Sequence, residues 1–214
     1  MVRIDEPVAG LRERGRVHRM NLIRTAAQEL FAEKGYEQVT TREVAQRAGV
    51  GEATLFRYVH RKTELLLLVV GDRIADSVDR LIAEAESGSR SDGRSYIDRI
   101  YRIYDGRAEL YLTDPDNVTA FVREGLDSSS SFKAESMVYG DRIIAAVAGI
   151  VREGQQAGQL FGGVDAATVA LNCNGFYVHE ITRSPARHFT LETFPKRLRA
   201  RLAAQLEPLV VERP

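Results

Sequence analysis

The chain has 214 residues, of which 44% are hydrophobic, so it can bury a sizeable core and hold one or two domains. Lys and Arg together number 30 and so do Asp and Glu, and the single Cys173 excludes an internal disulfide and a zinc site built from several cysteines. The longest apolar run, Leu65 to Val70, is too short to span a bilayer, and the N-terminus lacks the apolar region of a secretory signal. These features predict a soluble cytoplasmic protein with no membrane partner.

The zero net charge hides an uneven distribution. Residues 1–63 carry 12 Lys and Arg against 8 Asp and Glu, whereas the rest of the chain carries 18 against 22. A basic excess in the N-terminal part favours a nucleic-acid surface there, although an excess of four is modest. Residues 1–16, with Arg12, Arg14 and Arg16, are predicted as a flexible basic arm. Such an arm is either a disordered tail or a contact to phosphates and the minor groove.

Local signals predict three short helices after this arm. Apolar residues spaced by three and four predict a first helix over Val17 to Lys34. Thr40 and Glu43 have the spacing of a capping box, which satisfies the first free N–H groups of a second helix. Gly49 can take the left-handed conformation that ends this helix, and Gly51 is an acceptable N-cap for the next one. Two short helices joined by a glycine turn are typical of a helix-turn-helix unit that reads the DNA major groove.

From Val17 to Leu68 the sequence resembles the N-terminal domain of the TetR family of transcriptional regulators. The resemblance implies a helix-turn-helix DNA-binding domain over residues 17–63 and a helical effector-binding and dimerisation domain over residues 64–214. The matching residues are specific only as a set, namely Ile23, Ala26-Ala27, Leu30-Phe31, Gly35-Tyr36, Thr40, Val44-Ala45, Ala48-Gly49-Val50, Thr54-Leu55-Phe56, Tyr58 and Lys62.

The resemblance makes Gly51 to Tyr58 the recognition helix. Arg57 could bond guanine and Glu52 could accept a hydrogen bond from cytosine. The resemblance implies that Thr41, Tyr58 and Lys62 contact the DNA backbone. Tyr58 could instead be a core aromatic, and Arg57 a solvated surface charge. The full expected DNA-binding set is Thr41, Arg42, Gly51, Glu52, Ala53, Thr54, Phe56, Arg57, Tyr58 and Lys62.

Three residues depart from the family pattern. Phe56 stands where the family usually has Tyr, so only packing is expected of it, and Arg61 replaces the usual small cap of the fourth helix. Glu52 would bring negative charge close to phosphates. The residues found at Gly51, Ala53, Phe56 and Arg61 keep open an alternative function, a ligand-binding or interaction module of the same fold that no longer binds DNA.

The remaining sequence is helical by periodicity, with no alternation of the β type. A fourth helix begins near Lys62 and ends in the Ser87–Gly93 segment, which is predicted as a flexible connection. A serine break at residues 128–131 and Ser184-Pro185 interrupt the later part of the chain. The prediction is an all-α protein of about nine helices, in which the later ones cover residues 96–112, 115–126, 132–157, 165–183 and 190–210.

Two features of the later helices concern partners. An apolar stripe on the last helix, and small residues on the helix before it, either pack within one chain or form a homodimer interface through the last two helices, and the resemblance favours the dimer. The stripe consists of Leu191, Phe194, Leu198, Leu202, Leu206 and Leu209, and the small residues are Ala166, Ala167, Ala170 and Gly175.

The resemblance further implies a pocket for a small-molecule effector among the middle helices. The supply of aromatic residues favours an apolar or aromatic effector, although an aromatic residue at helical spacing belongs to the core more often than to the wall of a ligand site. The candidate effector-binding residues are Tyr101, Tyr104, Phe121, Phe132, Asn172 and Phe176.

These observations together predict a ligand-responsive repressor that binds a palindromic double-stranded DNA operator as a dimer and is released by its effector. No catalytic residues and no cofactor are expected, because the sequence has no nucleophile elbow, phosphate-binding loop or HExxH motif. No metal site is expected either, because His179-Glu180 has no second ligand at helical spacing.

Overall fold

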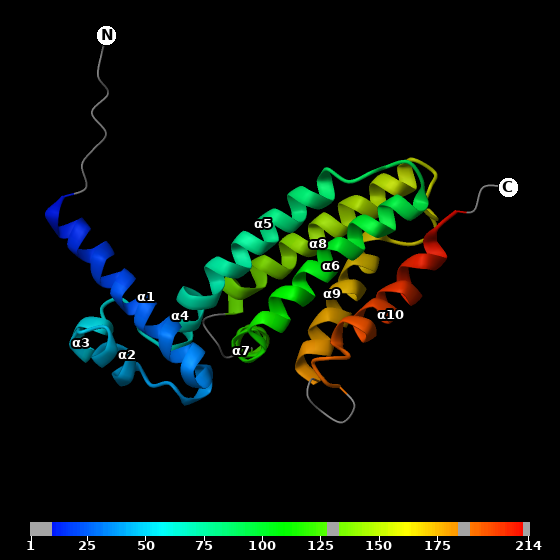
Figure 1. Ribbon diagram of the computed structural model, residues 1–214. Helices are drawn as coiled ribbons and strands as arrows, with labels where there is room; N and C mark the ends of the chain where they lie inside the picture. The colour runs from blue at the N-terminus through cyan, green and yellow to red at the C-terminus, as the bar shows by residue number, and fades with distance from the viewer. Residues whose placement is uncertain (1–9, 128–132, 184–188, 212–214) are drawn as a thin grey trace, which may run out of the picture. The chain divides into compact units, whose positions relative to one another are not determined.

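The computed structural model describes residues 10–127, 133–183 and 189–211. The chain divides into two compact units, an N-terminal unit (Met1–Val69) and a C-terminal unit (Val70–Pro214). Over the described residues every regular element is helical, apart from a single antiparallel bridge between Leu160 and Val210. The all-α prediction is therefore confirmed (Figure 1). None of the described helices combines the length and apolarity needed to cross a membrane.

The N-terminal unit is built from four helices, α1 (Leu11–Gln38), α2 (Thr41–Arg47), α3 (Glu52–Leu55) and α4 (Lys62–Leu66). Helix α1 packs against α2 and α4, and α2 packs against α3. The apolar face predicted for α1 is buried at Ile23, Ala27, Leu30 and Phe31, and it meets the buried side chains of the following helices, Val44, Ala45 and Leu55.

Helix α1 begins at Leu11, six residues before the predicted start, so part of the expected basic arm is helical. The N–H groups of Glu13 and Arg14 donate to the carbonyl of Gly10, and Arg16 forms an ion pair with Glu13 at 2.9 Å. This first stretch of the helix carries almost no apolar residue, so hydrophobic periodicity gave no sign of it. Residues 1–9 lie outside the described residues.

The predicted fourth helix is continuous but changes its winding. Helix α4 is followed by a π-helical turn, η1 (Leu67–Gly71), and then by α5 (Asp72–Glu86). Counted as one element, these three segments bring the described α-helices to the nine that the sequence predicted. The π turn spans the boundary between the two units, and insertions of this kind are frequent at functional sites.

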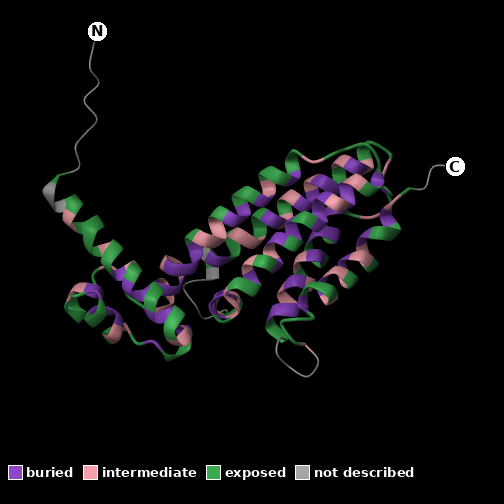
Figure 2. Ribbon diagram, in the orientation of Figure 1, coloured by how far each residue is buried: buried purple, intermediate pink, exposed green. Residues whose placement is uncertain are grey.

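The C-terminal unit is a helical bundle. Helix α8 contacts α5, α6, α7 and α9, while α10 packs on α6 and α9. The buried faces of these helices turn toward one another (Figure 2). The bundle consists of α5, α6 (Gly93–Thr113), α7 (Pro115–Leu126), α8 (Lys133–Gln156), α9 (Ala166–Arg183), α10 (Phe194–Leu206) and the short 3-10 helix η2 (Glu207–Leu209).

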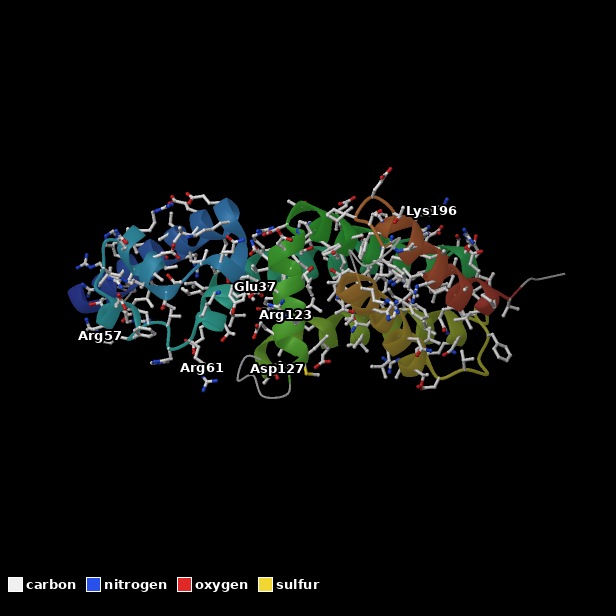
Figure 3. The ribbon with its side chains drawn as sticks, turned by 90° about the horizontal axis from the view of Figure 1, so that it is seen from below. Glu37, Arg57, Arg61, Arg123, Asp127 and Lys196 are labelled. Carbon is white, nitrogen blue, oxygen red and sulfur yellow. The ribbon has the colours of Figure 1, made fainter. Side chains whose placement is uncertain are left out.

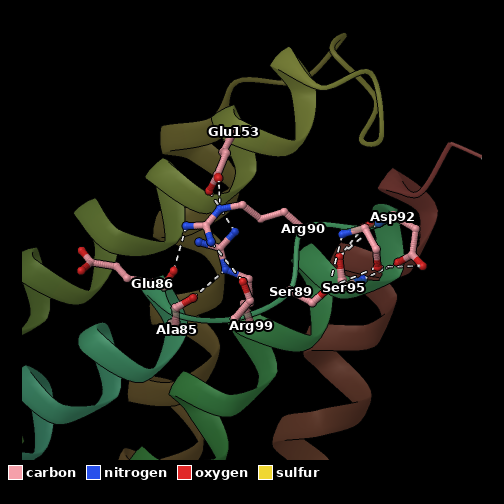
Figure 4. A network of polar contacts seen from close by, with 10 residues as sticks. Ala85, Glu86, Ser89, Arg90, Asp92, Ser95, Arg99 and Glu153 are labelled. Atoms are coloured by element: carbon pink, nitrogen blue, oxygen red, sulfur yellow. Dashed lines mark hydrogen bonds and ion pairs between the residues drawn. The ribbon is translucent and has the colours of Figure 1, made fainter.

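The connection between α5 and α6, predicted as flexible, is held by charged groups (Figure 4). Arg90 donates to the carbonyls of Glu86 at 2.8 Å and Gly88 at 3.1 Å, and it forms an ion pair with Glu153 on α8. The buried Arg99 donates to the carbonyl of Ala85 at 2.6 Å and to the same Glu153 at 2.9 Å. Composition alone suggested flexibility, because the partner that fixes the segment lies far along the chain.

The apolar stripe of the last helix is buried inside its own chain, so its assignment to the dimer interface was wrong. The ring of Phe194 packs against the rings of Tyr111 and Tyr177, with distances between ring centres of 4.5 Å and 6.3 Å. Only Leu191 of the stripe is exposed, whereas Phe194, Leu198, Leu202, Leu206 and Leu209 are buried. The stripe satisfies the bundle of a single chain, which the residue spacing could not distinguish from an interface.

A buried acid reinforces the same contact. Glu180 on α9 is 0% exposed, and its two oxygens lie 2.7 Å from Nε of Arg197 and 2.7 Å from Nε of Arg201 on α10. Because a carboxylate is costly to bury unless it is paired, the two arginines fix the position of α10 against α9.

Candidate DNA-binding surface and effector cavity

The capping box predicted for α2 is present. Oγ1 of Thr40 accepts from the N–H of Glu43 at 3.2 Å, and Oε2 of Glu43 accepts from the N–H of Thr40 at 2.8 Å. Glu43 also pairs with Lys34 on α1. The hydrogen bond from Lys34, followed by those from Thr40, lowers the pKa of Glu43 to about 2. The local prediction is therefore confirmed, and the cap also connects α2 to α1.

The turn after α2 has the geometry that a glycine permits. Gly49 has a φ of 67°, and the N–H of Val50 donates to the carbonyl of Ala45 at 3.0 Å. Gly51 is the N-cap of α3, and Leu55, which is 0% exposed, anchors α3 in the unit. The rest of the short helix is consequently left at the surface.

Most of the expected recognition segment is exposed. Glu52, Ala53 and Arg57 are exposed, and Arg57 projects outward as Figure 3 shows. Nη2 of Arg57 donates to Oγ1 of the half-buried Thr54 at 3.1 Å. Phe56, for which only packing was expected, is 41% exposed, so part of its side chain lies at the surface. An exposed aromatic edge can contact the methyl group of thymine.

Two of the expected DNA contacts face each other. Nε of Arg42 on α2 lies 3.4 Å from Oε1 of Glu52 on α3. Both side chains are largely exposed, so the pair is weak and can open. Thr41 is half-buried at the start of α2, and Gly51 is exposed.

The remaining two expected contacts are held by neighbours on α1. The hydroxyl of the half-buried Tyr58 accepts from Nε of Arg19 at 3.0 Å, so Tyr58 is not a fully buried core aromatic. Lys62 donates to the carbonyl of Glu37 at 2.9 Å and lies 4.4 Å from the ring centre of Tyr36. Sequence reasoning missed Arg19, because no local spacing connects it to Tyr58.

The cap of α4 lacks a side-chain hydrogen bond, as the sequence predicted for Arg61. Oε2 of Glu64 accepts from the N–H of His60 at 2.8 Å and so satisfies one of the free donors there.

The C-terminal unit contains a cavity of about 310 Å³, at the lower end of the range of roughly 300–1,000 Å³ typical of small-molecule sites. Helices α5, α6, α7, α8 and α9 all contribute to its wall. Most of the lining is apolar, comprising Ile74, Val78, Leu110, Val118, Phe121, Val122, Leu126, Met137, Ile144, Leu171 and Val178. The remaining lining residues are Ser77, Arg107, Gly125, Ser136, Tyr139, Gly140, Asp141, Asn174 and Tyr177.

Arg107 on α6 is a polar group of this wall that contacts several neighbouring side chains. Its guanidinium carbon lies 3.7 Å from the ring centre of Tyr177 and 5.4 Å from that of Tyr104. Nη1 of Arg107 donates to Oδ1 of Asn174 at 2.9 Å, and the hydroxyl of Tyr177 donates to the main-chain carbonyl of Arg107 at 3.3 Å. Burial raises the pKa of Tyr177, so this hydroxyl stays protonated.

Residues 23–69 match the model of the family described as "Bacterial regulatory proteins, tetR family". This chain carries a TetR-family domain. The match covers α3 and the turn that precedes it, so the exposed residues Phe56 and Arg57 lie within the matched domain.

Solved structures resemble the whole chain. FadR from Thermus thermophilus, a TetR-family transcriptional repressor in complex with lauroyl-CoA, is 22% identical with a TM-score of 0.65, and the match covers 91% of this chain and 97% of that chain. FadR from Bacillus subtilis, in complex with stearoyl-CoA, is 18% identical with a TM-score of 0.63, covering 86% and 97%. A regulator from Saccharomonospora viridis in complex with choline is 22% identical with a TM-score of 0.62, covering 91% and 98%. A search of curated proteins finds no significant match.

Of the residues predicted to bind the effector, Phe121 lines the cavity. Tyr101 does not line it, because its ring lies 3.3 Å from the guanidinium carbon of Arg199 and its hydroxyl donates to Oε1 of Glu207 at 3.0 Å. Burial, together with this bond to Glu207, raises the pKa of Tyr101 to about 12. Tyr101 therefore joins α6 to the end of α10 instead of facing a ligand.

Three further candidates also lie away from the cavity of this TetR-like chain. Tyr104 is buried in the core, Asn172 is exposed and donates to Gln205 at 3.4 Å, and Phe176 is half-buried outside the lining. Phe132 lies outside the described residues. Asn174, two positions after Asn172, is the amide that reaches the cavity, since the two residues point to different faces of α9.

Metal binding has no support among the residues that the structure describes. They contain no group of three or more His, Cys, Asp or Glu side chains able to hold an ion. In the His179-Glu180 pair, Glu180 is engaged by Arg197 and Arg201.

Proposed function

We propose that the protein is a ligand-responsive transcriptional repressor, with the N-terminal unit as its DNA-binding domain and the C-terminal unit as its effector-binding and dimerisation domain. The observation that carries this proposal is the exposed surface of Glu52, Phe56 and Arg57 within a TetR-family domain. The same chain also holds a ligand-sized cavity. Because its target would be chromosomal DNA, we place its action in the cytoplasm.

In this proposal the recognition surface consists of α3 and its neighbours. Arg57 reads a base edge, and Phe56 contacts a thymine methyl or a sugar. Arg42, once released from Glu52, contacts a phosphate. Arg19 holds the hydroxyl of Tyr58 beside this surface at 3.0 Å. Opening the exposed Arg42–Glu52 pair costs little, about 0–1 kcal/mol for pairs of this kind.

We further propose that two copies associate through the outward faces of α9 and α10, so that two DNA-binding domains read a palindrome. Ala167, Leu171 and Gly175 recur at four-residue spacing on the exposed side of α9, and Leu171 is 56% exposed. A Cβ added at Gly175 would meet no atom within 4 Å in the single chain, so packing within this chain does not explain the glycine. Ala200 and Ala204 are the exposed small residues of α10.

The effector in this proposal occupies the cavity of the C-terminal unit and is small and largely apolar. The similar structures contain acyl-CoA molecules in two cases and choline in a third, so related folds hold ligands of opposite charge. Tenfold release from DNA requires only about 1.4 kcal/mol of difference in ligand affinity between the DNA-bound and the free state.

DNA binding is tested by fluorescence anisotropy on duplexes selected from a randomised pool. We expect affinity to fall steeply with salt, as phosphate contacts require. Arg57→Ala should weaken the selected site by about 1–3 kcal/mol and relax its base preference. Arg102→Ala, an exposed arginine on α6, is the matched control and should bind normally. Failure to select any duplex at low salt would contradict the proposal.

The dimer is tested by light scattering of the whole chain. Gly175→Glu should give monomers, whereas Ala83→Glu, at an exposed position on α5, should leave the mass of the wild type unchanged. A wild-type chain that is monomeric at every concentration would exclude the dimer.

A second function is favoured by one observation, the contact of Arg42 with Glu52. If this pair stays closed, the TetR-family domain presents little net positive charge to DNA and the protein is a ligand-binding or interaction module. The variant Glu52→Gln separates the two functions: a regulator gains DNA affinity from the release of Arg42, whereas a module that does not bind DNA gains none.

A further inference from the structure

Arg107 is a cation in a wall made mainly of apolar side chains. It is half-buried on α6, and Val118 and Phe121 of α7 and Ile144 of α8 line the same cavity. Stacking on Tyr177 at 3.7 Å and the bond to Asn174 at 2.9 Å fix the plane of the guanidinium. A group held in this way is already oriented before a ligand arrives.

The charge of Arg107 has no carboxylate partner within ion-pair distance among the described residues. Other arginines of the C-terminal unit have carboxylate partners. Arg99 forms an ion pair with Glu153 at 2.9 Å, and Arg197 forms one with Glu180 at 2.7 Å. The side chain of Arg107 donates to Asn174, and hydrogen bonds with Arg107 also oppose the rise that burial causes in the pKa values of Tyr104 and Tyr177. None of these partners is a carboxylate, so the positive charge of Arg107 is available to an anionic ligand.

We propose that the cavity selects small organic monocarboxylates, with the carboxylate on the guanidinium of Arg107 and the apolar part of the ligand against Phe121, Val118 and Ile144. This inference rests on the proposed effector site and names the class of its ligand. Arginine binds a planar carboxylate through two parallel hydrogen bonds, and a rigid guanidinium gains most from this arrangement.

The surroundings of Arg107 favour a single negative charge. One cation can balance one carboxylate, whereas the second charge of a phosphate monoester would be left in a mainly apolar cavity, at a high cost. An amine would meet the like charge of Arg107. The acidic residue that also lines the cavity, Asp141, is exposed to solvent and forms no ion pair with Arg107, so it neither neutralises Arg107 nor sits in an equally dry environment.

The test uses three ligands that differ only in the terminal group: 4-phenylbutyrate, 4-phenylbutan-1-ol and 4-phenylbutylamine. Each is titrated into the full-length wild-type protein by calorimetry, with a thermal shift as a second measurement. We expect the carboxylate to bind at least tenfold more tightly than the alcohol, and the amine to bind most weakly. Equal binding of carboxylate and alcohol, tighter binding of the amine, or no binding by any of the three would overturn the inference.

Variants then locate the selectivity. In Arg107→Met the carboxylate and the alcohol should bind within about twofold of each other, and Arg107→Lys should retain part of the preference. The control Arg102→Met removes an exposed arginine from the same helix and should keep the full preference. If Arg107→Met fails to fold, which circular dichroism would reveal, Arg107→Lys and the wild-type series still decide. A preference that persists in Arg107→Met, or that Arg102→Met abolishes, would overturn the inference.

The ligand titrations and the DNA-binding test can give independent results, so failure of the carboxylate proposal can be distinguished from failure of the proposed function. Carboxylate selectivity that depends on Arg107, in a protein that binds no duplex, would support this inference and contradict the repressor. A protein that binds its selected duplex but does not distinguish the three ligands would contradict this inference and leave the repressor standing.

Discussion

The two units of the chain are specified by contacts of different range. In the N-terminal unit, several of the features expected to meet DNA depend on residues close in sequence: Thr40 caps with Glu43, and Arg57 bonds Thr54, each pair three residues apart, although Arg19 reaches Tyr58 across 39 residues. In the C-terminal unit, Tyr101 bonds Glu207 across 106 residues and Arg199 bonds Asp105 across 94. The comparison teaches that contacts within a short segment can specify a binding surface, whereas the shape of a cavity depends on how all the helices of the bundle pack.

The units also differ in how they treat charge. The N-terminal unit keeps its functional polar groups at the surface, as in the Arg42–Glu52 pair. The C-terminal unit buries charge where helices must be fixed, at Glu180 and at Arg99. Removal of one partner of an ion pair should therefore lower the free energy of unfolding by a large amount in the C-terminal unit and by a small amount in the N-terminal unit.

The largest effect is expected for Glu180→Gln, which removes the buried charge between α9 and α10. The free energy of unfolding should fall by about 3 kcal/mol, at the lower end of the range for broken buried pairs, because Arg197 and Arg201 retain some contact with solvent. Urea unfolding followed by circular dichroism measures this value. The exposed pair Arg80–Glu84 provides the control, since Glu84→Gln should change stability by less than about 0.5 kcal/mol. Similar effects of the two substitutions would remove the contrast between buried and exposed pairs.

The local specification of the N-terminal unit is tested by two glycines with opposite expectations. Gly49 has a φ of 67°, so Gly49→Ala should destabilise the unit by about 1–2 kcal/mol. Gly15 lies within α1, where Gly15→Ala should stabilise by roughly 0.5–1 kcal/mol because alanine is the better helix former. Thermal unfolding of both variants measures the difference. A neutral Gly49→Ala would show that the turn does not depend on its left-handed residue.

A smaller effect is expected where a long-range contact holds an exposed segment. Arg90→Ala should lower the free energy of unfolding by at most about 1 kcal/mol, because the ion pair between Arg90 and Glu153 is partly solvated. The amide hydrogens of residues 87–92 should exchange faster, while those of α6 beyond its first turns should not change. Hydrogen exchange followed by mass spectrometry measures both. Unchanged exchange in the segment would mean that Arg90 does not hold it.

The smallest effect, and one that depends on pH, is expected at Glu43. Its pKa in the folded state is about 2, below the ordinary value of 4.5, because of the bond from Lys34 and those from Thr40. The folded state thus binds fewer protons than the unfolded state, and the stabilisation is present above pH 4.5 and is lost as the pH falls toward 2. Urea unfolding at several values between pH 5 and 3 should show a smaller decline in Glu43→Gln than in the wild type. Parallel declines would indicate that Glu43 is not the group responsible.

Several features could be predicted from the sequence because their causes are local. The bounds of α7, opened by Pro115, and of α9, preceded by Asp165, follow from capping chemistry; the carboxylate of Asp165 accepts from the N–H of Thr168 at 2.8 Å. The helix-turn-helix unit followed from Thr40, Glu43 and Gly49 in the same way.

Other features could not be predicted, because several packings suit the same pattern. The stripe of the last helix suits a dimer interface as well as a bundle, and only the packing of Phe194 on Tyr111 distinguishes the two. Helical periodicity does not show which aromatic residues border a cavity: of the two candidates Phe121 and Tyr101, the structure places Phe121 in the lining and Tyr101 against Glu207.

The sequence by itself determined the all-α architecture and the exposed glycine-linked helices of the TetR-family domain, because caps, turns and helical periodicity act over about four residues. The tertiary structure alone decided that Arg107 meets Phe121 in one cavity and that Glu180 is enclosed by two arginines. Such placements depend on which helix faces are left unfilled when segments far apart in sequence pack together, and that packing is settled by the whole core at once.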